Sequence, residues 1–345
     1  MSRSVKGSPI TACAAWVAIA IVLIAVLGGC GSRKDSSGGT RNEDVEIKVL
    51  SAETVVTNWF AEPEHGGLYA ALAKGFYKNK GLDMTIQPGG PQVSSIQQVA
   101  AGQVNFGMAQ ADELLLAREE GIPVVGIFAI FQKDPQAIMV HSEAQIEDFG
   151  DLNGRTVYVA QGAMYWEYLK RAYKLDKVKE MTFTGNYSGF LQDKESGVQS
   201  YITSDPYIFK TKNVDVKFLL IYDSGYQPYA NVLFTTEKMI KEQPEIVKAF
   251  VEATAEGWNY YRTDYDEINP VIHKVNPDIS LESMKATAEN EMELIFSGDA
   301  ESNGVGTMTE ERWMSLAEKM VEIGLIPNTD EVKNVYTTEF LSNTK

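Results

Sequence analysis

The sequence predicts an α/β protein in which two lobes are joined by two passages of the chain. From Val45 to about residue 141, short β-rich runs alternate with amphipathic helical patterns, and a smaller alternation of the same kind begins near Asp151. Beyond Thr236 the pattern is almost entirely helical. Repeated β-α-β units with short connections need crossovers, so each lobe is expected to hold a largely parallel sheet covered by helices.

In the first lobe, alternating apolar residues indicate strands, and apolar residues at three- or four-residue spacing indicate helices. A strand is expected at 46–50, and the helix that follows carries Leu68, Leu72 and Phe76 on one stripe and ends at Gly81. Asp112 is expected to be the N-cap of a later helix. The other elements expected here are strands at 83–87, 104–109, 124–131 and 138–141 and a helix at 93–100.

The second lobe and the C-terminal part follow from the same patterns. A helix is expected at 165–173, with strands at 156–160, 181–184, 199–203 and 216–221. Helices at 245–261, 281–295 and 310–323 carry apolar stripes and are expected to pack back on the first lobe. The two passages between lobes are expected at 141–149 and 222–231, which divides the chain into lobe 1 (45–140), lobe 2 (141–229) and a return to lobe 1 with the C-terminal helices (230–345).

The N-terminal segment has the pattern of a lipoprotein signal peptide. An apolar run at 14–27 is of the length of a signal and short for a membrane span. The residues LGGC at 27–30 resemble a bacterial lipobox, so we expect cleavage before Cys30 and lipidation of its thiol. Residues 1–29 are then the signal peptide, and 30–44, rich in Gly and Ser, begin with the lipidated cysteine and form a flexible tether. An ordinary secretory signal or an uncleaved anchor is the alternative.

Composition excludes several classes of protein. Cys13 and Cys30 are the only cysteines, so the mature chain is expected to have no disulfide and no thiolate metal site. The three histidines lack metal-binding spacing, and neither a GxSxG elbow nor a Walker loop is present. The net charge of −16, which becomes more negative when Arg3 and Lys6 are removed, disfavours nucleic acid as a partner. We expect no catalytic residues, no metal and no cofactor.

Candidate ligand-binding residues lie in loops after predicted strands, where open parallel sheets bind ligands. They are Trp59, Glu62, His65, Gln110, Asp112 and Gln132 in the first lobe and Tyr165, Trp166, Tyr187, Asp205 and Tyr226 in the second. Each has a simpler interpretation, because an indole can belong to the core and Asp112 can be only a helix cap. Many aromatic residues without Lys or Arg favour a flat, uncharged aromatic ligand over a small anion.

Several motifs resemble a known family. They are NWF at 58–60 with HGGLY at 65–69, AKGFY at 73–77, AGQVNFG at 101–107, GIPVV at 121–125 and DLNGRTV at 151–157. Together they resemble the SsuA/THI5-like group of ABC-importer solute-binding proteins, which have the bilobal type II periplasmic-binding fold.

The resemblance implies a monomeric, lipid-anchored protein outside the cytoplasm that delivers a small aromatic heterocycle to an ABC permease and its ATPase. Riboflavin-like molecules and thiamine-precursor pyrimidines are the ligand classes it favours, with Asp205 as the counterpart of an acidic residue that receives a ring amino group. Sulfonate- and nitrate-type binding proteins share the fold and are the alternative. An enzyme that makes a pyrimidine is a further alternative, although the cysteine-rich CCCFC segment of that synthase is absent from the sequence.

Overall fold

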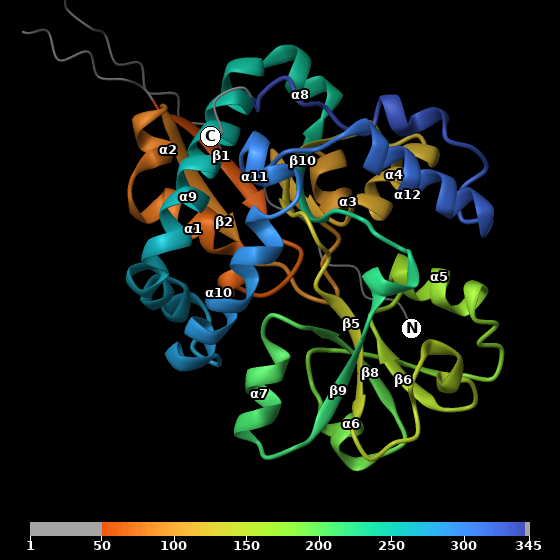
Figure 1. Ribbon diagram of the computed structural model, residues 1–345. Helices are drawn as coiled ribbons and strands as arrows, with labels where there is room; N and C mark the ends of the chain where they lie inside the picture. Colours follow the sequence, from red (N-terminus) through yellow and green to blue (C-terminus); the bar gives the residue numbers. More distant parts are fainter. Residues whose placement is uncertain (1–49, 342–345) are drawn as a thin grey trace, which may run out of the picture. The chain divides into compact units, whose positions relative to one another are not determined.

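The computed structural model describes residues 50–341 (Figure 1). The chain divides into two compact units, Met1–Ile47 and Lys48–Lys345, and the described residues belong to the second. The expected signal peptide, Cys30 and the tether at 30–44 lie outside the described residues. The same holds for most of the strand expected at 46–50, so the first described strand is β1, Ser51–Val56.

The first sheet has the strand order β2-β1-β3-β10-β4. Its strands are β1, β2 (Leu82–Gln87), β3 (Phe106–Ala109), β4 (Val124–Phe131) and β10 (Ala230–Thr236). The first three are parallel and are connected by helices, whereas β10 runs antiparallel to β3 and β4, so the sheet is mixed. Every residue of β4 is buried, as its continuous apolar sequence VVGIFAIF requires. The helices of this part are α1 (Gly66–Ala73), α2 (Phe76–Asn79), α3 (Ser95–Ala100) and α4 (Ala111–Glu119), with the short 3-10 helix η1 (Pro63–His65) before α1.

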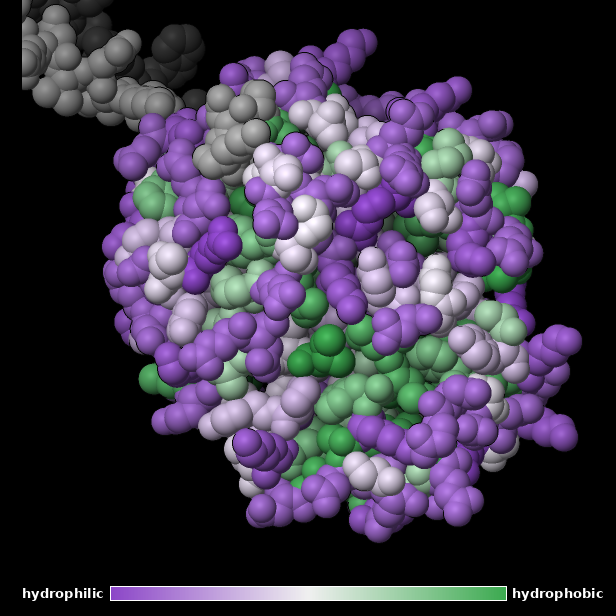
Figure 2. Space-filling view, in the orientation of Figure 1, coloured by the Kyte–Doolittle hydropathy of each residue, from purple (hydrophilic) through white to green (hydrophobic). Residues whose placement is uncertain are grey.

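The second sheet has the order β7-β6-β8-β5-β9 and is also mixed. Its strands are β5 (Gln136–His141), β6 (Thr156–Val159), β7 (Lys179–Thr182), β8 (Gly197–Tyr201) and β9 (Val216–Leu220), with helices α5 (Met164–Ala172), α6 (Ser188–Gln192) and α7 (Asp205–Thr211). On the face shown in Figure 2, apolar side chains gather over this sheet, and β9, its edge strand, is half-buried along its length.

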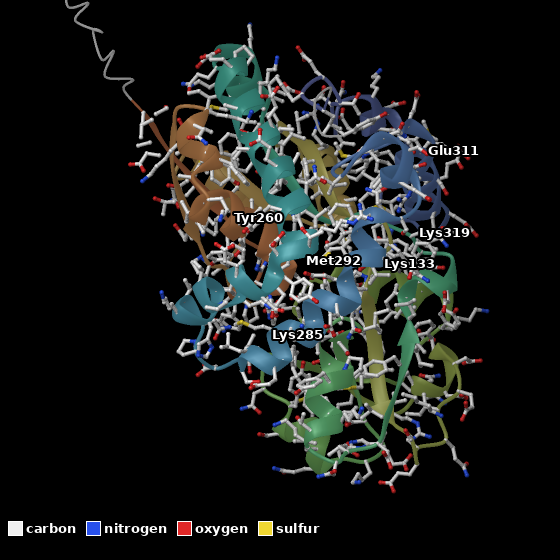
Figure 3. The ribbon with its side chains drawn as sticks, turned by 60° about the vertical axis from the view of Figure 1, so that its left-hand side comes forward. Lys133, Tyr260, Lys285, Met292, Glu311 and Lys319 are labelled. Atoms are coloured by element: carbon white, nitrogen blue, oxygen red, sulfur yellow. The ribbon has the colours of Figure 1, made fainter. Side chains whose placement is uncertain are left out.

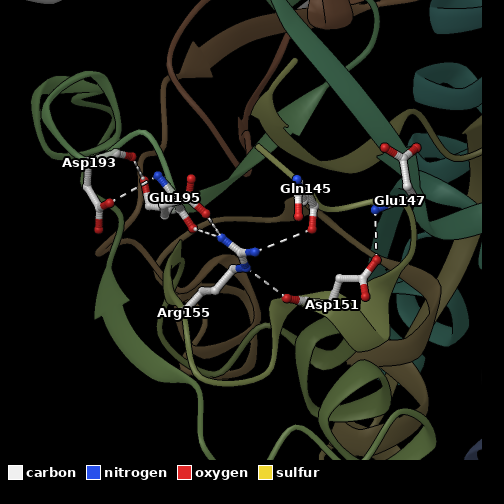
Figure 4. A network of polar contacts seen from close by, with 7 residues as sticks. Gln145, Glu147, Asp151, Arg155, Asp193 and Glu195 are labelled. Carbon is white, nitrogen blue, oxygen red and sulfur yellow. Dashed lines mark hydrogen bonds and ion pairs between the residues drawn. The ribbon is translucent and has the colours of Figure 1, made fainter. Parts of the chain in front are cut away.

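A polar network joins the loops of the second lobe. The Arg155 guanidinium donates to the carbonyl oxygens of Asp151 and Gln145, at 3.0 and 3.3 Å, and pairs with the Glu195 carboxylate (Figure 4). The Asp151 carboxylate in turn accepts the Glu147 N–H. These bonds hold together the loops that precede β6 and β8.

The first passage between the lobes differs from the prediction. The strand expected to end the first lobe, β5, pairs with β8 and β9 in the second sheet. The chain therefore crosses at residues 132–135, before β5, and not at 141–149. Periodicity located this strand but does not tell which sheet it joins. The second passage, between β9 and β10 at residues 221–229, nearly coincides with the expected range of 222–231. Nζ of Lys133, which is labelled in Figure 3, lies 5.0 Å from the centre of the Tyr222 ring, so the two passages touch.

The C-terminal helices pack on the first lobe, as expected. They are α8 (Glu237–Glu242), α9 (Pro244–Val275), α10 (Leu281–Phe296), α11 (Asp299–Asn303) and α12 (Glu310–Glu322). Helix α9 packs against α1, and α12 against α4. Among the described residues, no helix combines the length and apolar character that crossing a membrane requires.

Close packing of α9 on α1 depends on Gly257. A Cβ atom at this position would lie 2.1 Å from the carbonyl oxygen of Gly67. Since the obstacle is backbone, neither helix can relieve the clash by a rotamer change, and we expect Gly257→Ala to lower the free energy of unfolding by about 3 kcal/mol. Urea unfolding measures this. The neighbouring exposed variant Glu256→Ala loses only one ion pair with Lys80 and should cost less than about 1 kcal/mol. Equal effects of the two variants would contradict this account of the packing.

Candidate functional site

A cleft of about 940 Å³ lies between the lobes, and strand-end loops of both sheets line it. Seven of its lining residues are acidic and none is Lys or Arg. A volume of this size is enough for a ligand of several rings or a ring with a substituent. The cleft is therefore a site for a small molecule that is rich in carboxyl groups.

A pair of aromatic rings, one from each lobe, lies at one end of this cleft. The Trp59 ring from the first lobe is parallel to the Phe183 ring from the second, with an interplanar angle of 5° and ring centres 6.4 Å apart. Phe60 meets Trp59 edge-on, and Tyr187 packs against Phe183. The carbonyl oxygen of Trp59 accepts the Thr57 hydroxyl and the Gly89 N–H, which fixes the loop. Flat π-faces from both lobes make this end of the cleft suited to an aromatic ring.

A chain of amide groups orders the floor of the cleft. Asn58 donates its amide N–H to the Asn231 side-chain oxygen at 2.8 Å, so the oxygen of Asn58 faces His65 Nε2, 3.2 Å away. That nitrogen therefore carries the hydrogen. Burial lowers the pKa of His65 to about 3, which keeps the ring neutral. Gln110 accepts the Asn231 N–H and donates to the Tyr201 hydroxyl of the second lobe at 2.9 Å.

The N-cap of α4 is Gln110, which corrects the prediction for Asp112. Gln110 and Glu113 form a capping box, in which the Glu113 carboxylate accepts the Gln110 N–H at 2.9 Å. Asp112 is the second residue of the helix and lines the cleft, where its carboxylate accepts a hydrogen bond from the Tyr226 hydroxyl at 2.7 Å. Burial raises the pKa of Asp112 to about 6.

Three more carboxyl groups gather where the lobes meet: Glu62, Glu64 and Asp205. The Thr203 hydroxyl of the second lobe donates to Glu64 Oε1 at 2.7 Å. Asp205 accepts the Tyr187 hydroxyl at 2.7 Å and the Tyr201 N–H at 3.1 Å. Burial raises the pKa of all three groups, that of Glu64 to about 7, and the charge of Asp205 raises those of Glu62 and Glu64 further. Near neutral pH the Glu64 carboxyl can therefore both donate and accept hydrogen bonds.

Most of the predicted site residues lie together in the cleft. Its lining includes Trp59, Glu62, His65, Gln110, Asp112, Tyr165, Tyr187 and Asp205. The hydroxyl of Tyr165 donates to Gln199 Oε1 at 3.1 Å.

Three predicted site residues lie elsewhere. Trp166 is buried in the core of the second lobe, because the buried face of α5 is wider than the stripe that the sequence indicated. Its indole N–H donates to Glu180 at 2.9 Å. Gln132, at the start of the first passage, turns away from the cleft and donates to the Thr307 carbonyl oxygen at 3.0 Å. Tyr226 lies behind Asp112 and positions its carboxylate.

Sequence reasoning missed several residues of the cleft, among them Glu64, Phe183, Gln199 and Tyr201. Phe183 directly follows β7 and Tyr201 ends β8, so the strand-end rule applied to the first lobe could have found both. Glu64 lies in the same loop as Glu62 and His65. Nothing in the sequence marks Gln199, which lies within β8.

Comparison with known proteins bears on this cleft. The family model described as NMT1/THI5 like matches residues 62–268. The riboflavin-binding protein RibY of Chloroflexus aurantiacus is 24% identical over 307 residues, which cover 85% of this chain and 87% of RibY. The formylaminopyrimidine-binding protein of Halalkalibacterium halodurans is 22% identical over a region that covers 79% of this chain and 85% of that protein.

An enzyme is also among the relatives. The 4-amino-5-hydroxymethyl-2-methylpyrimidine phosphate synthase of Legionella pneumophila is 22% identical over a region that covers 67% of this chain and 76% of the synthase. Family membership alone therefore does not separate binding proteins from enzymes.

Solved structures confirm the predicted fold. The periplasmic aliphatic sulphonate binding protein SsuA of Escherichia coli superposes with a TM-score of 0.65 at 11% identity, covering 84% of this chain and 92% of SsuA. The Candida albicans CA3427 gene product, described as having the generic periplasmic binding protein fold, superposes with a TM-score of 0.58 at 14% identity. The match covers 84% of this chain and 97% of the CA3427 product.

The raised pKa of Glu64 predicts a pH dependence of stability. In the folded protein this carboxyl holds its proton up to about pH 7, against an ordinary value of 4.5, so the stability it contributes below pH 4.5 is lost as the pH rises through 7. Glu64→Gln keeps the shape and removes this ionisation. The free energy of unfolding of the variant minus that of the wild type should therefore be roughly 3 kcal/mol larger at pH 8 than at pH 4.5. Urea unfolding at both pH values measures the gain, and a Glu64→Gln difference that is constant with pH would refute the assignment.

Proposed function

The chain belongs to the NMT1/THI5-like family, and on this premise we propose that it is the solute-binding protein of an ABC importer, acting outside the cytoplasm. Support comes from the two lobes joined by two touching passages, with a cleft between them that both line. Such an arrangement allows the lobes to close over a ligand by motion at the passages. RibY and the formylaminopyrimidine-binding protein, which match most of the chain, are named as binding proteins.

The ligand we propose is a small aromatic heterocycle, either riboflavin-like or a thiamine-precursor pyrimidine. The observation that carries this proposal is the parallel pair of Trp59 and Phe183, contributed by opposite lobes. A sulfonate or nitrate would instead need cationic or N–H donors, and the cleft lining offers acidic groups and no Lys or Arg. The small anions of the alternative reading are therefore disfavoured.

Isothermal titration calorimetry with riboflavin, 4-amino-5-hydroxymethyl-2-methylpyrimidine and ethanesulfonate tests this proposal. We expect one of the two heterocycles to bind and the sulfonate not to bind. Loss of a desolvated stacking ring costs roughly 2 to 4 kcal/mol, so Trp59→Ala and Phe183→Ala should each weaken binding about 30-fold to 1,000-fold. Trp166→Phe, in the core of the second lobe, is the control and should change the affinity less than about threefold while lowering stability. Tight binding of the sulfonate would refute the proposed ligand class, and so would wild-type affinity of both Trp59→Ala and Phe183→Ala.

A pyrimidine-forming enzyme is the second candidate, because a synthase is among the relatives. A synthase forms a pyrimidine, whereas a binding protein only returns the compound that it was given. Mass spectrometry of a pyrimidine-free cell extract incubated with the protein separates the two functions, and we expect no pyrimidine to form. Formation of a pyrimidine that requires the folded protein would favour the enzyme.

We propose further that the protein is a monomer held at the membrane by a lipid on Cys30. This residue lies outside the described residues, and its sequence context is the support. Cys30→Ser removes the thiol that would carry the diacylglycerol, so labelling with a radioactive fatty acid should be lost and the protein should leave the membrane fraction. Equal labelling of Cys30→Ser and wild type would overturn the lipid anchor.

A further inference from the structure

One face of α10 carries polar residues where an apolar face is expected. Ser283, Thr287 and Glu291 follow one another at four-residue spacing, so they share a face of the helix. All three are buried, and Glu291 has no exposed surface. This face packs against η1, which carries Glu64 and His65. Ser283 and Thr287 line the cleft together with these two residues, and Glu291 lies one turn further along the helix.

The atoms gathered there are almost all hydrogen-bond acceptors without a partner. Within residues 50–341, Glu64 Oε2, His65 Nδ1 and both carboxyl oxygens of Glu291 make no hydrogen bond. The buried Ser283 hydroxyl oxygen is also unpartnered. His65 Nδ1 is an acceptor because Nε2 donates to Asn58. Buried acceptors without donors are unfavourable, so this arrangement is suited to a group that brings several N–H donors.

The charged groups around this pocket are of one sign. Glu62 and Glu64 of the first lobe act electrostatically on Glu291, and Asp205 of the second lobe acts on Glu62 and Glu64. The basic residue of α10, Lys285, pairs with Asp266 and Glu289 on the outer side of the helix, away from the cleft (Figure 3). Two unpartnered donors of α9, Trp258 Nε1 and Asn269 Nδ2, flank Tyr261, and neither residue lines the cleft.

We propose that Ser283, Thr287 and Glu291, with Glu64 and His65, form an inner subsite for a protonated amine carried by the ligand. The proposal rests on the proposed function and narrows the ligand to a heterocycle with an amine-bearing arm. An ammonium group supplies three N–H donors and one positive charge, which matches an acceptor-rich, acidic pocket. The ring then lies nearer Trp59 and Phe183, and the arm extends toward α10.

Two pyrimidines that differ only in this arm test the subsite: 4-amino-5-aminomethyl-2-methylpyrimidine and its 5-hydroxymethyl counterpart. By calorimetry at pH 7 we expect the full-length wild type, solubilised in detergent, to bind the aminomethyl compound at least tenfold more tightly. Glu291→Gln keeps the side-chain shape, cannot ionise beside an ammonium group and replaces one acceptor oxygen by an N–H donor, so it should bring the two affinities within about twofold. Ser283→Ala should reduce the preference about threefold. Glu293→Gln, exposed on the same helix, is the matched control and should keep the full preference.

The outcomes separate this proposal from the proposed function. If the wild type binds both pyrimidines equally, or binds riboflavin and neither pyrimidine, the subsite is refuted and the binding function stands. A full preference retained in Glu291→Gln and Ser283→Ala also refutes it, with thermal melting used to show that the variants are folded. If Glu291→Gln does not fold, the Ser283→Ala result decides. If none of the three compounds binds, the proposed function fails and the subsite with it.

Discussion

The cleft depends on two pairs of antiparallel strands that lie end to end. In the first sheet β4 pairs with β10, and in the second β5 pairs with β9, so both passages of the chain are continuations of paired strands. Because each passage is short and the two touch through Lys133 and Tyr222, we expect any relative motion of the lobes to be a hinge at the passages. The strand-end loops of both sheets then face each other across the same gap, and the residues of the cleft owe their proximity to this pairing.

Asn231, near the start of β10, shows how the passage also shapes the site. Its φ of 52° lies in the left-handed region, which Asn tolerates better than most residues. Its N–H donates to the Gln110 side chain, while its amide oxygen accepts from Asn58. One residue of the return strand therefore orients two loops of the first lobe, and through Asn58 it also fixes the tautomer of His65.

The sequence was sufficient for the fold class because periodicity and glycine-bounded strands are local properties. β10 was missed even though its residues ANVLFTT are strongly apolar, since no helical pattern precedes it as in the β-α-β units around it. The first passage was placed too late for a related reason: the pairing partner of β5 lies more than 50 residues away in the chain. Non-local pairing decides sheet membership, and no local pattern records it.

In the candidate site, too, local sequence features predicted some residues, and others depend on non-local packing. Loop position identified Trp59, Glu62 and His65, because one segment of chain carries all three between a strand and a helix. Trp166 was misassigned because a helical stripe gives the centre of a buried face and not its width. The polar face of α10 was not predicted, because only the apolar stripe of this helix was identified, and Ser283 and Thr287 are ordinary helix residues until the neighbours that bury them are known.

Glu64 connects recognition with the relative position of the lobes. One of its carboxyl oxygens accepts the Thr203 hydroxyl of the second lobe, and the other is unpartnered and faces the α10 side of the cleft. The Asn290 side chain of α10 also donates to the Thr203 carbonyl oxygen, at 2.9 Å, so the same loop of the second lobe is held from two sides. A donor bound at the free oxygen would favour the ionised form of Glu64, and an ionised Glu64 accepts the Thr203 bond more strongly. Occupation of the cleft and contact between the lobes would therefore reinforce each other through a single carboxyl group.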